Sequence, residues 1–283
     1  MINTLAAKKI REMLAEDLGS GDVTSEAIVP PKLGVRGEIV ARQAGTVAGT
    51  AEVTAVFNEA GVKVKVIRSD GAVVRPGDII IRLEGQARRI LAAERVALNL
   101  LMRMSGIATA TRKLIGMAKR RNPKVAISAT RKTAPLLTYF DKRAVVIAGG
   151  KPHRYRLSDH ILIKDNHLRL VGSVSEAVRR ARKVAGRTEI EVEVSTPKEV
   201  LDAARAGASI VMFDNMKPAE IKRAIKLLER EDLRRKVRLE ASGRIDLSNV
   251  GDFAATGVDI ISSSYMTMRA PALDMSLEIR RKD

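Results

Sequence analysis

Short apolar runs alternate with amphipathic segments throughout the second half of this chain. The runs with the length and Val/Ile content of strands are Val125–Ser128, Val145–Ala148, Ile161–Ile163, Ile190–Val194, Ile210–Phe213, Val237–Leu239 and Val258–Ile261. The segments with helical periodicity are Ile107–Lys119, Ser175–Val184, Pro197–Ala206, Pro218–Glu229 and Leu247–Ala255. Alternation with such short connections is typical of parallel strands joined by helices. The sequence therefore predicts an α/β barrel.

The predicted barrel departs from an eightfold repeat in two places. Seven strands are visible instead of eight, and Gly149–Asp159 has the composition of a loop where a helix is expected. We therefore expect an open or incomplete seven-stranded barrel, with the gap covered by a second domain or a second subunit. Local signals support the boundaries, since Thr196 and Pro197 suit the start of a helix and Gly207 suits its end.

The residues before this repeat follow a different pattern. Gly34–Val47, Val62–Ile67 and Asp78–Leu83 are rich in Val and Ile and are separated by turns, which predicts an α+β sandwich domain. The helices expected around these strands are Met1–Leu18, Ala87–Arg103 as a link to the barrel, and Ala270–Asp283, which we expect to pack back on the N-terminal layer. The predicted domains are residues 1–104 with 268–283 for the sandwich, and 105–267 for the catalytic barrel.

Composition excludes several classes of protein. The chain of 283 residues has no cysteine, which rules out disulfides, thiolate catalysis and sulfur-ligated metals. No apolar stretch is long enough to span a bilayer, so we expect a soluble, cytoplasmic protein without a membrane partner. The net charge of +18 fits a nucleic-acid surface, a pocket for acidic small molecules, or a host that favours Arg and Lys. Aromatic residues are only 2% of the chain and the charges are spread over nearly every helix, which disfavours nucleic acid.

Polar side chains follow the predicted strands at their C-terminal ends. They comprise basic residues (Arg131, Lys132, His153, Arg154, Lys164), acids (Glu193, Asp214) and small residues (Ser242, Gly243, Ser262, Ser263, Ser264). Parallel strands of a barrel end on one face, so these groups are expected to share one pocket. Clustered cations repel one another unless an anion binds between them, and guanidinium and ammonium groups bind carboxylates and phosphates. The predicted ligand carries several negative charges.

The acids and the small residues leave alternatives open. Glu193 and Asp214 end neighbouring strands, where they could hold Mg²⁺ or accept hydrogen bonds from sugar hydroxyls. Alternatively, Glu189, Glu191 and Glu193, which share one face of their strand, pair with basic side chains of the barrel. Backbone amides near Ser242 and near Ser262–Ser264 could hold a phosphate.

The three histidines, His153, His160 and His167, raise the question of a zinc site. The strand Ile161–Ile163 separates the last two and places their rings on opposite faces or ends, and no cysteine or acid completes a convincing ligand set. We therefore do not expect zinc, and favour a hydrogen bond from His153 to an anionic substrate. Motifs of serine hydrolases, P-loops and dinucleotide folds are absent.

Short motifs spread over nearly the whole chain carry a family resemblance. They are Glu16-Asp17-Leu18-Gly19-Ser20-Gly21-Asp22-Val23-Thr24, Glu94-Arg95, Leu98-Asn99, Ser105-Gly106-Ile107-Ala108-Thr109, Thr130-Arg131-Lys132-Thr133, Pro152-His153-Arg154, Leu157-Ser158-Asp159, Leu162-Ile163-Lys164-Asp165-Asn166-His167, Glu191-Val192-Glu193, Asp214-Asn215-Met216, Glu240-Ala241-Ser242-Gly243 and Ala270-Pro271-Ala272-Leu273-Asp274. With these motifs in this order, the chain resembles the quinolinate phosphoribosyltransferases, also called nicotinate-nucleotide pyrophosphorylases (carboxylating).

The resemblance implies a type II phosphoribosyltransferase-like fold and a pentosyltransferase of NAD biosynthesis. The implied reaction transfers a phosphoribosyl group from phosphoribosyl pyrophosphate to quinolinate with decarboxylation. Its products are nicotinate mononucleotide, pyrophosphate and CO₂, and Mg²⁺ is the implied cofactor. A homodimer, or a higher homo-oligomer, is implied as well.

The resemblance also assigns roles by position. Arg131, His153 and Arg154 correspond to ligands of the quinolinate carboxylates, and Lys132 and Lys164 to cations near the phosphates and the dicarboxylate. The remaining correspondences are Glu193 and Asp214 for Mg²⁺ and ribose, Ser242, Gly243, Ser263 and Ser264 for the 5′-phosphate, and Arg95 for a residue donated across the dimer interface. Catalysis is assigned to Lys132, Lys164, Glu193 and Asp214.

The chain departs from the family pattern in three loops. Ala134-Pro135-Leu136 stands where Thr-Pro-Gly is common, Gly149-Gly150-Lys151-Pro152 stands where a Gly-rich turn and Asn precede His, and Gly is common near Ser264. A related family associated with molybdenum uptake shares the Pro-His-Arg features, but the intact Lys164-Asp165-Asn166-His167 argues against it. The remaining alternatives are a nucleic-acid-binding barrel and a relative that binds substrate without turnover.

Overall fold

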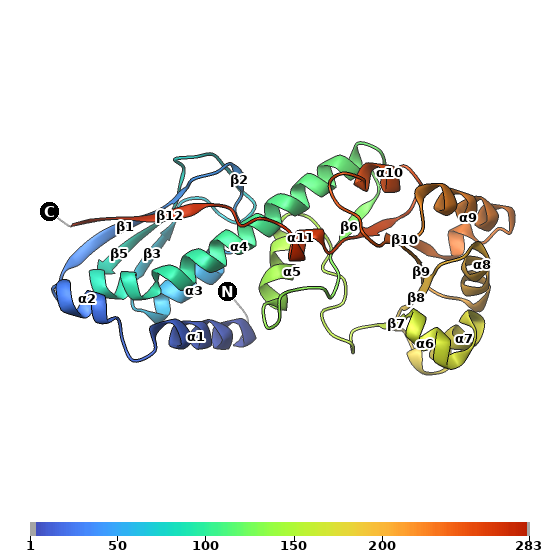
Figure 1. The fold of residues 1–283 in the computed structure, drawn as a ribbon, viewed down its shortest axis with the longest axis horizontal. Coiled ribbons are helices and arrows are strands. Elements are labelled where there is room, and N and C mark those ends of the chain that lie inside the picture. The colour runs from blue at the N-terminus through green and yellow to red at the C-terminus, as the bar shows by residue number, and fades with distance from the viewer. Residues whose placement is uncertain (1–3, 282–283) are drawn as a thin grey trace. The chain divides into compact units, whose positions relative to one another are not determined.

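The computed structural model describes residues 4–281, which form two compact units (Figure 1). One unit contains the described residues up to Ala110, the segment Tyr139–Ala148 and the described residues from Ala270 onward. The other contains Thr111–Thr138 and Gly149–Arg269. The first three residues of the predicted opening helix and the last two of the predicted tail helix lie outside the described residues.

The first unit is built on a four-stranded antiparallel sheet with strand order β12-β1-β5-β3. Its strands are β1 (Gly34–Ala41), β3 (Lys63–Val66), β5 (Ile79–Gln86) and β12 (Met275–Arg281), and a short ribbon pairs β2 (Gly45–Thr46) with β4 (Val73–Val74). The helices are α1 (Thr4–Leu18), α2 (Val23–Ile28), α3 (Thr50–Glu59), α5 (Thr138–Ile147) and most of α4 (Ala87–Lys119). Val35 and Ile39 of β1 are buried while Arg36 between them is exposed, the alternation of a sheet with one buried face.

The second unit is built on a six-stranded parallel sheet with strand order β6-β11-β10-β9-β8-β7. The strands are β6 (Ala126–Ser128), β7 (Ile161–Ile163), β8 (Ile190–Val194), β9 (Ile210–Asp214), β10 (Arg238–Ser242) and β11 (Ile260–Ser262). The helices are α6 (Asp165–Val171), α7 (Val174–Ala185), α8 (Pro197–Ala206), α9 (Pro218–Arg230), α10 (Val250–Ala254), α11 (Tyr265–Met268) and the 3₁₀ helix η1 (Arg234–Lys236). Strand and helix alternate as the sequence predicts, which confirms the α/β fold class.

The capping signals of α8 behave as predicted. The Thr196 hydroxyl accepts a hydrogen bond from the backbone N–H of Glu199, and the Glu199 carboxylate accepts one in return from the backbone N–H of Thr196. Gly207 closes the helix in the left-handed conformation with φ 87°. These contacts satisfy backbone groups at both ends of the helix, which sets its length.

The predicted strand Val145–Ala148 is wrong, so the parallel sheet has six strands instead of seven. Val145–Ile147 form the last turn of α5, which the sequence did not predict. Phe140, Ala144 and Val145 are buried at helical spacing within the first unit. A four-residue apolar run fits both a strand and one face of a helix, so its pattern alone does not discriminate between them.

The predicted helix over Ala270–Asp283 is also wrong, because strand β12 occupies Met275–Arg281. Seven residues of β12 pair with β1 in antiparallel register, from Val35 opposite Arg281 to Ala41 opposite Met275. The backbone groups along the β1 edge would otherwise lack these partners. Pairing with β1, a strand distant in the sequence, therefore outweighs the helical periodicity of the tail.

The two helices predicted on either side of Met104 are one continuous helix, α4, of 33 residues. Gly106 lies inside it, where a Cβ atom would stand 2.1 Å from the carbonyl oxygen of Pro271. The glycine therefore permits a close approach of two segments and does not mark a break. Despite the length of α4, none of the helices within residues 4–281 is apolar enough over a sufficient length to span a membrane.

Candidate active site

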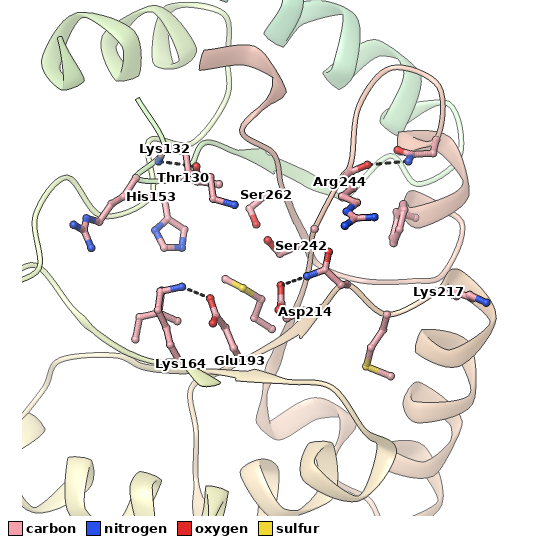
Figure 2. A pocket seen from close by; sticks show the side chains of 18 of the residues that line it. Thr130, Lys132, His153, Lys164, Glu193, Asp214, Lys217, Ser242, Arg244 and Ser262 are labelled. Carbon is pink, nitrogen blue, oxygen red and sulfur yellow. Dashed lines mark hydrogen bonds and ion pairs between the residues drawn. The ribbon is translucent and has the colours of Figure 1, made fainter. Parts of the chain in front are cut away.

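A cavity of about 1070 Å³ opens in the second unit at the C-terminal ends of its parallel strands (Figure 2). Residues at or just after the ends of all six strands line it. The predicted site residues among them are Arg131, Lys132, His153, Arg154, Lys164, Glu193, Asp214, Ser242 and Gly243. The sheet topology thus brings together side chains that are separated by more than a hundred positions in the sequence.

One part of the cavity wall is strongly basic. Arg131 and Lys132 are exposed, and neither has an ion-pair partner among residues 4–281. Arg154 is buried and donates a hydrogen bond from Nη1 to the carbonyl oxygen of His160 at 3.3 Å. Burial lowers the pKa of the Arg154 guanidinium, and the nearby charge of Arg131 lowers it further. Two positive charges held close together, one of them desolvated, favour binding of an anion.

The acids lie beside a lysine in the same cavity. Lys164 Nζ donates a hydrogen bond to Oε1 of Glu193, and Asp214 Oδ1 accepts one from Asn215 Nδ2 at 3.0 Å (Figure 2). Burial raises the pKa of Glu193, the Asp214 carboxylate adds to the rise, and the hydrogen bond and charge of Lys164 oppose it. A buried carboxylate with a second carboxylate near it provides a place for a cation.

The ends of β9 and β10 approach each other closely. The backbone N–H of Asn215 donates to the carbonyl oxygen of Ser242 at 2.9 Å. Gly243 has φ 105°, and a Cβ atom there would lie 2.4 Å from Oδ1 of Asn215. Only glycine meets both requirements, and its backbone is therefore open to the cavity without a side chain in front of it.

His153 lies at the cavity wall in contact with a buried acid. Its Nε2 atom lies 3.3 Å from Oε2 of Glu191, and Nε2 of His160 lies 2.9 Å from the same oxygen. Burial alone would raise the pKa of Glu191, but the hydrogen bonds and charges of the two histidines outweigh it and lower the pKa to about 2. The sequence-based statement that no acid completes a set of histidines is therefore wrong for this pair. His167 lies elsewhere and accepts a hydrogen bond from the backbone N–H of Lys164.

Three predicted site residues do not line this cavity. Ser263 is buried, and its hydroxyl donates to the carbonyl oxygen of Ile245 at 2.5 Å. Ser264 is the residue before α11, and the neighbouring Ser262 lines the cavity instead of either serine. Arg95 is an exposed residue of α4 in the first unit. Roles for these three in substrate binding stay predictions.

Sequence reasoning assigned no role to several residues that line the cavity. They are Thr130, Leu162, Met212, Asn215, Met216, Lys217, Pro218, Arg244, Asn249, Asp252 and Phe253. Asn215 and Arg244 directly follow predicted site residues, so the strand-end rule extends to both. Each also has a positive φ, 54° and 50° respectively, which is uncommon outside glycine and depends on surrounding contacts that a sequence does not show.

Comparisons with known proteins agree with this geometry. A model of the quinolinate phosphoribosyl transferase N-terminal domain matches residues 22–105, and a model of the C-terminal domain of the same family matches residues 107–278. The chain belongs to the quinolinate phosphoribosyltransferase family. The resemblance of the sequence motifs is thereby confirmed.

Other members of the quinolinate phosphoribosyltransferase family align over most of the chain. A probable nicotinate-nucleotide pyrophosphorylase (carboxylating) of Methanothermobacter thermautotrophicus is 44% identical over 272 residues, which is 96% of this chain and 98% of that protein. The human nicotinate-nucleotide pyrophosphorylase (carboxylating) is 36% identical over 86% of this chain and 82% of its own. The crystal structure of NadC from Streptococcus pyogenes matches with a TM-score of 0.93 at 34% identity and covers 100% of this chain and 99% of its own. The fold described above is therefore the family fold.

Proposed function

We propose that this chain transfers a phosphoribosyl group from phosphoribosyl pyrophosphate to quinolinate and removes one carboxylate, producing nicotinate mononucleotide, pyrophosphate and CO₂ for NAD biosynthesis. Family membership and the names of the relatives support this reaction. The observation that carries the proposal is the single cavity in which Arg131, Arg154 and Lys164 lie together with Glu193 and Asp214. Such a cavity accepts two anionic reactants that would repel each other in water.

The acceptor end of the cavity is assigned to Arg131, His153 and Arg154. Guanidinium groups bind carboxylates with two parallel hydrogen bonds, which suits a pyridine that carries two adjacent carboxylates. Arg154 is 6% exposed, so its charge is little screened by solvent. The desolvated guanidinium is therefore expected to supply a large part of quinolinate affinity.

Bond making and breaking occur at the anomeric carbon of the ribose. The pyridine nitrogen attacks this carbon as the bond to pyrophosphate breaks, and the ring nitrogen becomes positively charged. Lys132 and Lys164 line the cavity, and we assign to them the stabilisation of the negative charge that develops on the departing pyrophosphate. The positive ring nitrogen then stabilises the carbanion left on the adjacent carbon when CO₂ departs, and the electron pair of that carbanion binds a proton in place of the carboxylate.

Glu193 and Asp214 fit the requirements of Mg²⁺. They lie at the ends of neighbouring strands and line one cavity, and the Asp214 carboxylate adds to the rise in the pKa of Glu193 that burial causes. Mg²⁺ is commonly bound through one or two carboxylates together with substrate phosphates, so a pair of acids is sufficient. When bound, the ion neutralises charge on the pyrophosphate group. Lys164 holds Glu193 in position through the hydrogen bond described above.

The 5′-phosphate of the ribose is assigned to the loops after β10 and β11. Ser242 and Gly243 offer a hydroxyl and an uncovered backbone at the cavity, and Ser262 lies near the end of the next strand. The resemblance adds Ser263 and Ser264 to this group. Backbone N–H groups at such turns bind phosphate without a charged side chain.

We also propose a homodimer in which Arg95 of each subunit enters the active site of its partner. The support is the family resemblance, together with the exposure of Arg95 and the absence of an ion-pair partner for it among the described residues. An additional guanidinium would complete the recognition of an acceptor with two carboxylates.

One assay tests the proposed function. Purified chain is incubated with quinolinate and phosphoribosyl pyrophosphate, with and without Mg²⁺, and nicotinate mononucleotide is quantified by chromatography. We expect product only with Mg²⁺, and almost none from Arg131→Ala. Arg187→Ala, a change at an exposed residue outside the cavity, is the matched control and should keep wild-type activity. Full activity in Arg131→Ala would refute its assigned role, and absence of product from the wild type would refute the function.

A further inference from the structure

The cavity wall that carries His153 contains a second group of metal-ligating atoms, distinct from Glu193 and Asp214. Nε2 of His160 and Nε2 of His153 both point at Oε2 of Glu191, at 2.9 and 3.3 Å. The three donor groups lie within 4.8 Å of one another, and they are the only such set of three found among residues 4–281. We propose that His153, His160 and Glu191 bind a divalent transition metal such as Zn²⁺ or Co²⁺, and that the bound metal blocks the acceptor end of the cavity.

The backbone holds the three donors in place before any metal arrives. Glu191 lies in β8 and pairs in register with Leu162 of the neighbouring strand β7, and His160 directly precedes β7. His153 has φ 53°, and its ring centroid lies 5.1 Å from that of His160. A preformed arrangement of this kind lowers the cost of ordering the ligands when a metal binds.

Two imidazoles and one carboxylate form a recognised type of ligand set. Zinc is held by two histidines and one glutamate in several hydrolases, where a fourth position stays open for water or substrate. Glu191 is fully buried, and its second oxygen, Oε1, has no hydrogen-bond partner within the described part of the chain. The carboxylate therefore has coordinating capacity beyond its contacts with the two rings. Metal binding would replace those two contacts, and each imidazole would bind the ion through an Nε2 atom that carries no proton.

Ligand chemistry separates this site from the proposed magnesium site. Imidazole nitrogen favours zinc, cobalt, nickel and copper, whereas Mg²⁺ prefers oxygen ligands. Glu240, which is buried with Oε1 at 3.9 Å from Nε2 of His153, adds a second carboxylate close to the site. The Glu191 carboxylate partly offsets the positive charge of Arg154, whose guanidinium contacts the carbonyl oxygen of His160.

Occupation of this site would affect turnover through His153. This step rests on the proposed function, in which His153 contacts the carboxylates of quinolinate. A metal on Nε2 would fix the ring and occupy the nitrogen through which His153 is proposed to contact these carboxylates. We therefore expect Zn²⁺ to inhibit competitively with quinolinate and not with phosphoribosyl pyrophosphate.

The binding test uses Co²⁺ and the full chain without substrates. The chain contains no cysteine and three histidines, so few other groups can bind cobalt through nitrogen or sulfur. We expect one Co²⁺ per chain, with the intense visible absorption of four-coordinate cobalt and displacement by Zn²⁺. His160→Gln keeps a hydrogen-bond donor for Glu191 but removes the imidazole, and should weaken cobalt binding by at least about tenfold. His167→Gln changes the one histidine outside the set and should bind cobalt as the wild type does.

Three results of the cobalt-binding test would contradict the proposed metal site. Absence of the cobalt absorption in the wild type, equal affinity in His160→Gln, or a loss limited to His167→Gln would overturn the proposed site. Thermal unfolding followed by circular dichroism checks that His160→Gln is folded, and His160→Asn replaces it if it is not.

A second measurement separates this inference from the proposed function. Initial rates are recorded with Zn²⁺ at saturating Mg²⁺ while quinolinate is varied. His160→Gln should keep its basal rate and resist Zn²⁺ by at least about tenfold, because it lacks one metal ligand. Cobalt binding without any turnover would reject the proposed function and support the metal site. Turnover without cobalt binding would support the proposed function and reject the metal site.

Discussion

Lys164, directly after β7, donates a hydrogen bond to the carboxylate of Glu193 near the end of β8. The proposed ligand of Lys164 is an anion and that of Glu193 is Mg²⁺, so each residue holds the other in place until its own ligand binds. The pair lies in the cavity, with Lys164 partly exposed and Glu193 more deeply buried. A ligand that carries a phosphate would compete with Glu193 for the ammonium group, and Mg²⁺ would compete with Lys164 for the carboxylate. Binding of substrate with metal is therefore expected to separate the pair.

Lys164→Ala should lower kcat by about 10²- to 10³-fold, the usual cost of removing a group that stabilises developing charge. The protein should stay folded, because the lysine side chain is 41% exposed. Initial rates at saturating substrates measure the effect. The control is Lys183→Ala, a substitution at an exposed residue of α7. A kcat within a few-fold of the wild type would exclude Lys164 from catalysis.

Removal of Mg²⁺ with a chelator should stop turnover, and added Mg²⁺ should restore it. Glu193→Gln and Asp214→Asn should each raise the Mg²⁺ concentration needed for half-maximal rate by at least about tenfold, because each removes a charged oxygen ligand. The measurement is the rate as a function of Mg²⁺ at fixed phosphoribosyl pyrophosphate. An unchanged Mg²⁺ requirement in both variants would contradict the assignment of this pair.

Gly243→Ala should destabilise the protein and weaken binding of phosphoribosyl pyrophosphate. The added methyl group meets Asn215 and also forces an L-residue to φ 105°. Gly257→Ala is the matched control, since Gly257 has φ 92° but no atom within 4 Å of an added Cβ. We expect backbone strain to lower the free energy of unfolding of the control by about 1–2 kcal/mol, and crowding to lower that of Gly243→Ala by at least about 1 kcal/mol more. If urea denaturation gives the same decrease in unfolding free energy for both variants, crowding against Asn215 does not contribute to the effect of Gly243→Ala.

Stability should depend on pH through Glu52 in the first unit. Glu52 is fully buried, its Oε1 lies 2.5 Å from Nε of Arg143, and burial raises the pKa of Glu52 above the reference value of 4.5. Because the folded pKa is the higher one, the stabilisation linked to the protonated acid is complete below pH 4.5 and is lost as pH rises through the folded pKa.

Glu52→Gln removes this titration, so its free energy of unfolding relative to the wild type should increase with pH, by up to about 1.4 kcal/mol for each pKa unit of the shift. Urea denaturation between pH 4 and pH 8 measures the difference. Glu12→Gln, at a residue in an exposed pair with Lys8, should show no such trend. Parallel stability curves for Glu52→Gln and the wild type would contradict a raised pKa.

The proposed exchange of Arg95 between subunits predicts complementation. Arg95→Ala and Lys164→Ala should each be nearly inactive, but a mixture that has exchanged subunits should recover about a quarter of wild-type activity, because half of the dimers are mixed and each contains one intact site. The rate is measured before and after mild dissociation and reassembly. No recovery, despite mixed dimers detected by mass spectrometry, would place Arg95 outside the partner's active site.

Much of the second unit could be predicted from the sequence, because its elements are specified locally. Ile190–Val194 and Pro197–Ala206 are strand and helix with the predicted bounds, since an apolar run of strand length and a capping box act over a few residues. The position of Lys164, Glu193 and Asp214 at strand ends is likewise readable from the sequence. Parallel topology then places them on one face, which the cavity confirms.

Tertiary structure alone decided the features that depend on distant partners. The tail became β12 because β1 offered an edge, and Val145 became helical because its apolar face is buried within the first unit. The contact of His153 and His160 with Glu191 required the register of β7 on β8, which no local pattern contains. Local order in this chain is thus set by spacing and capping within about ten residues, whereas close approaches between distant segments are set by the burial and hydrogen bonding gained when the whole chain folds.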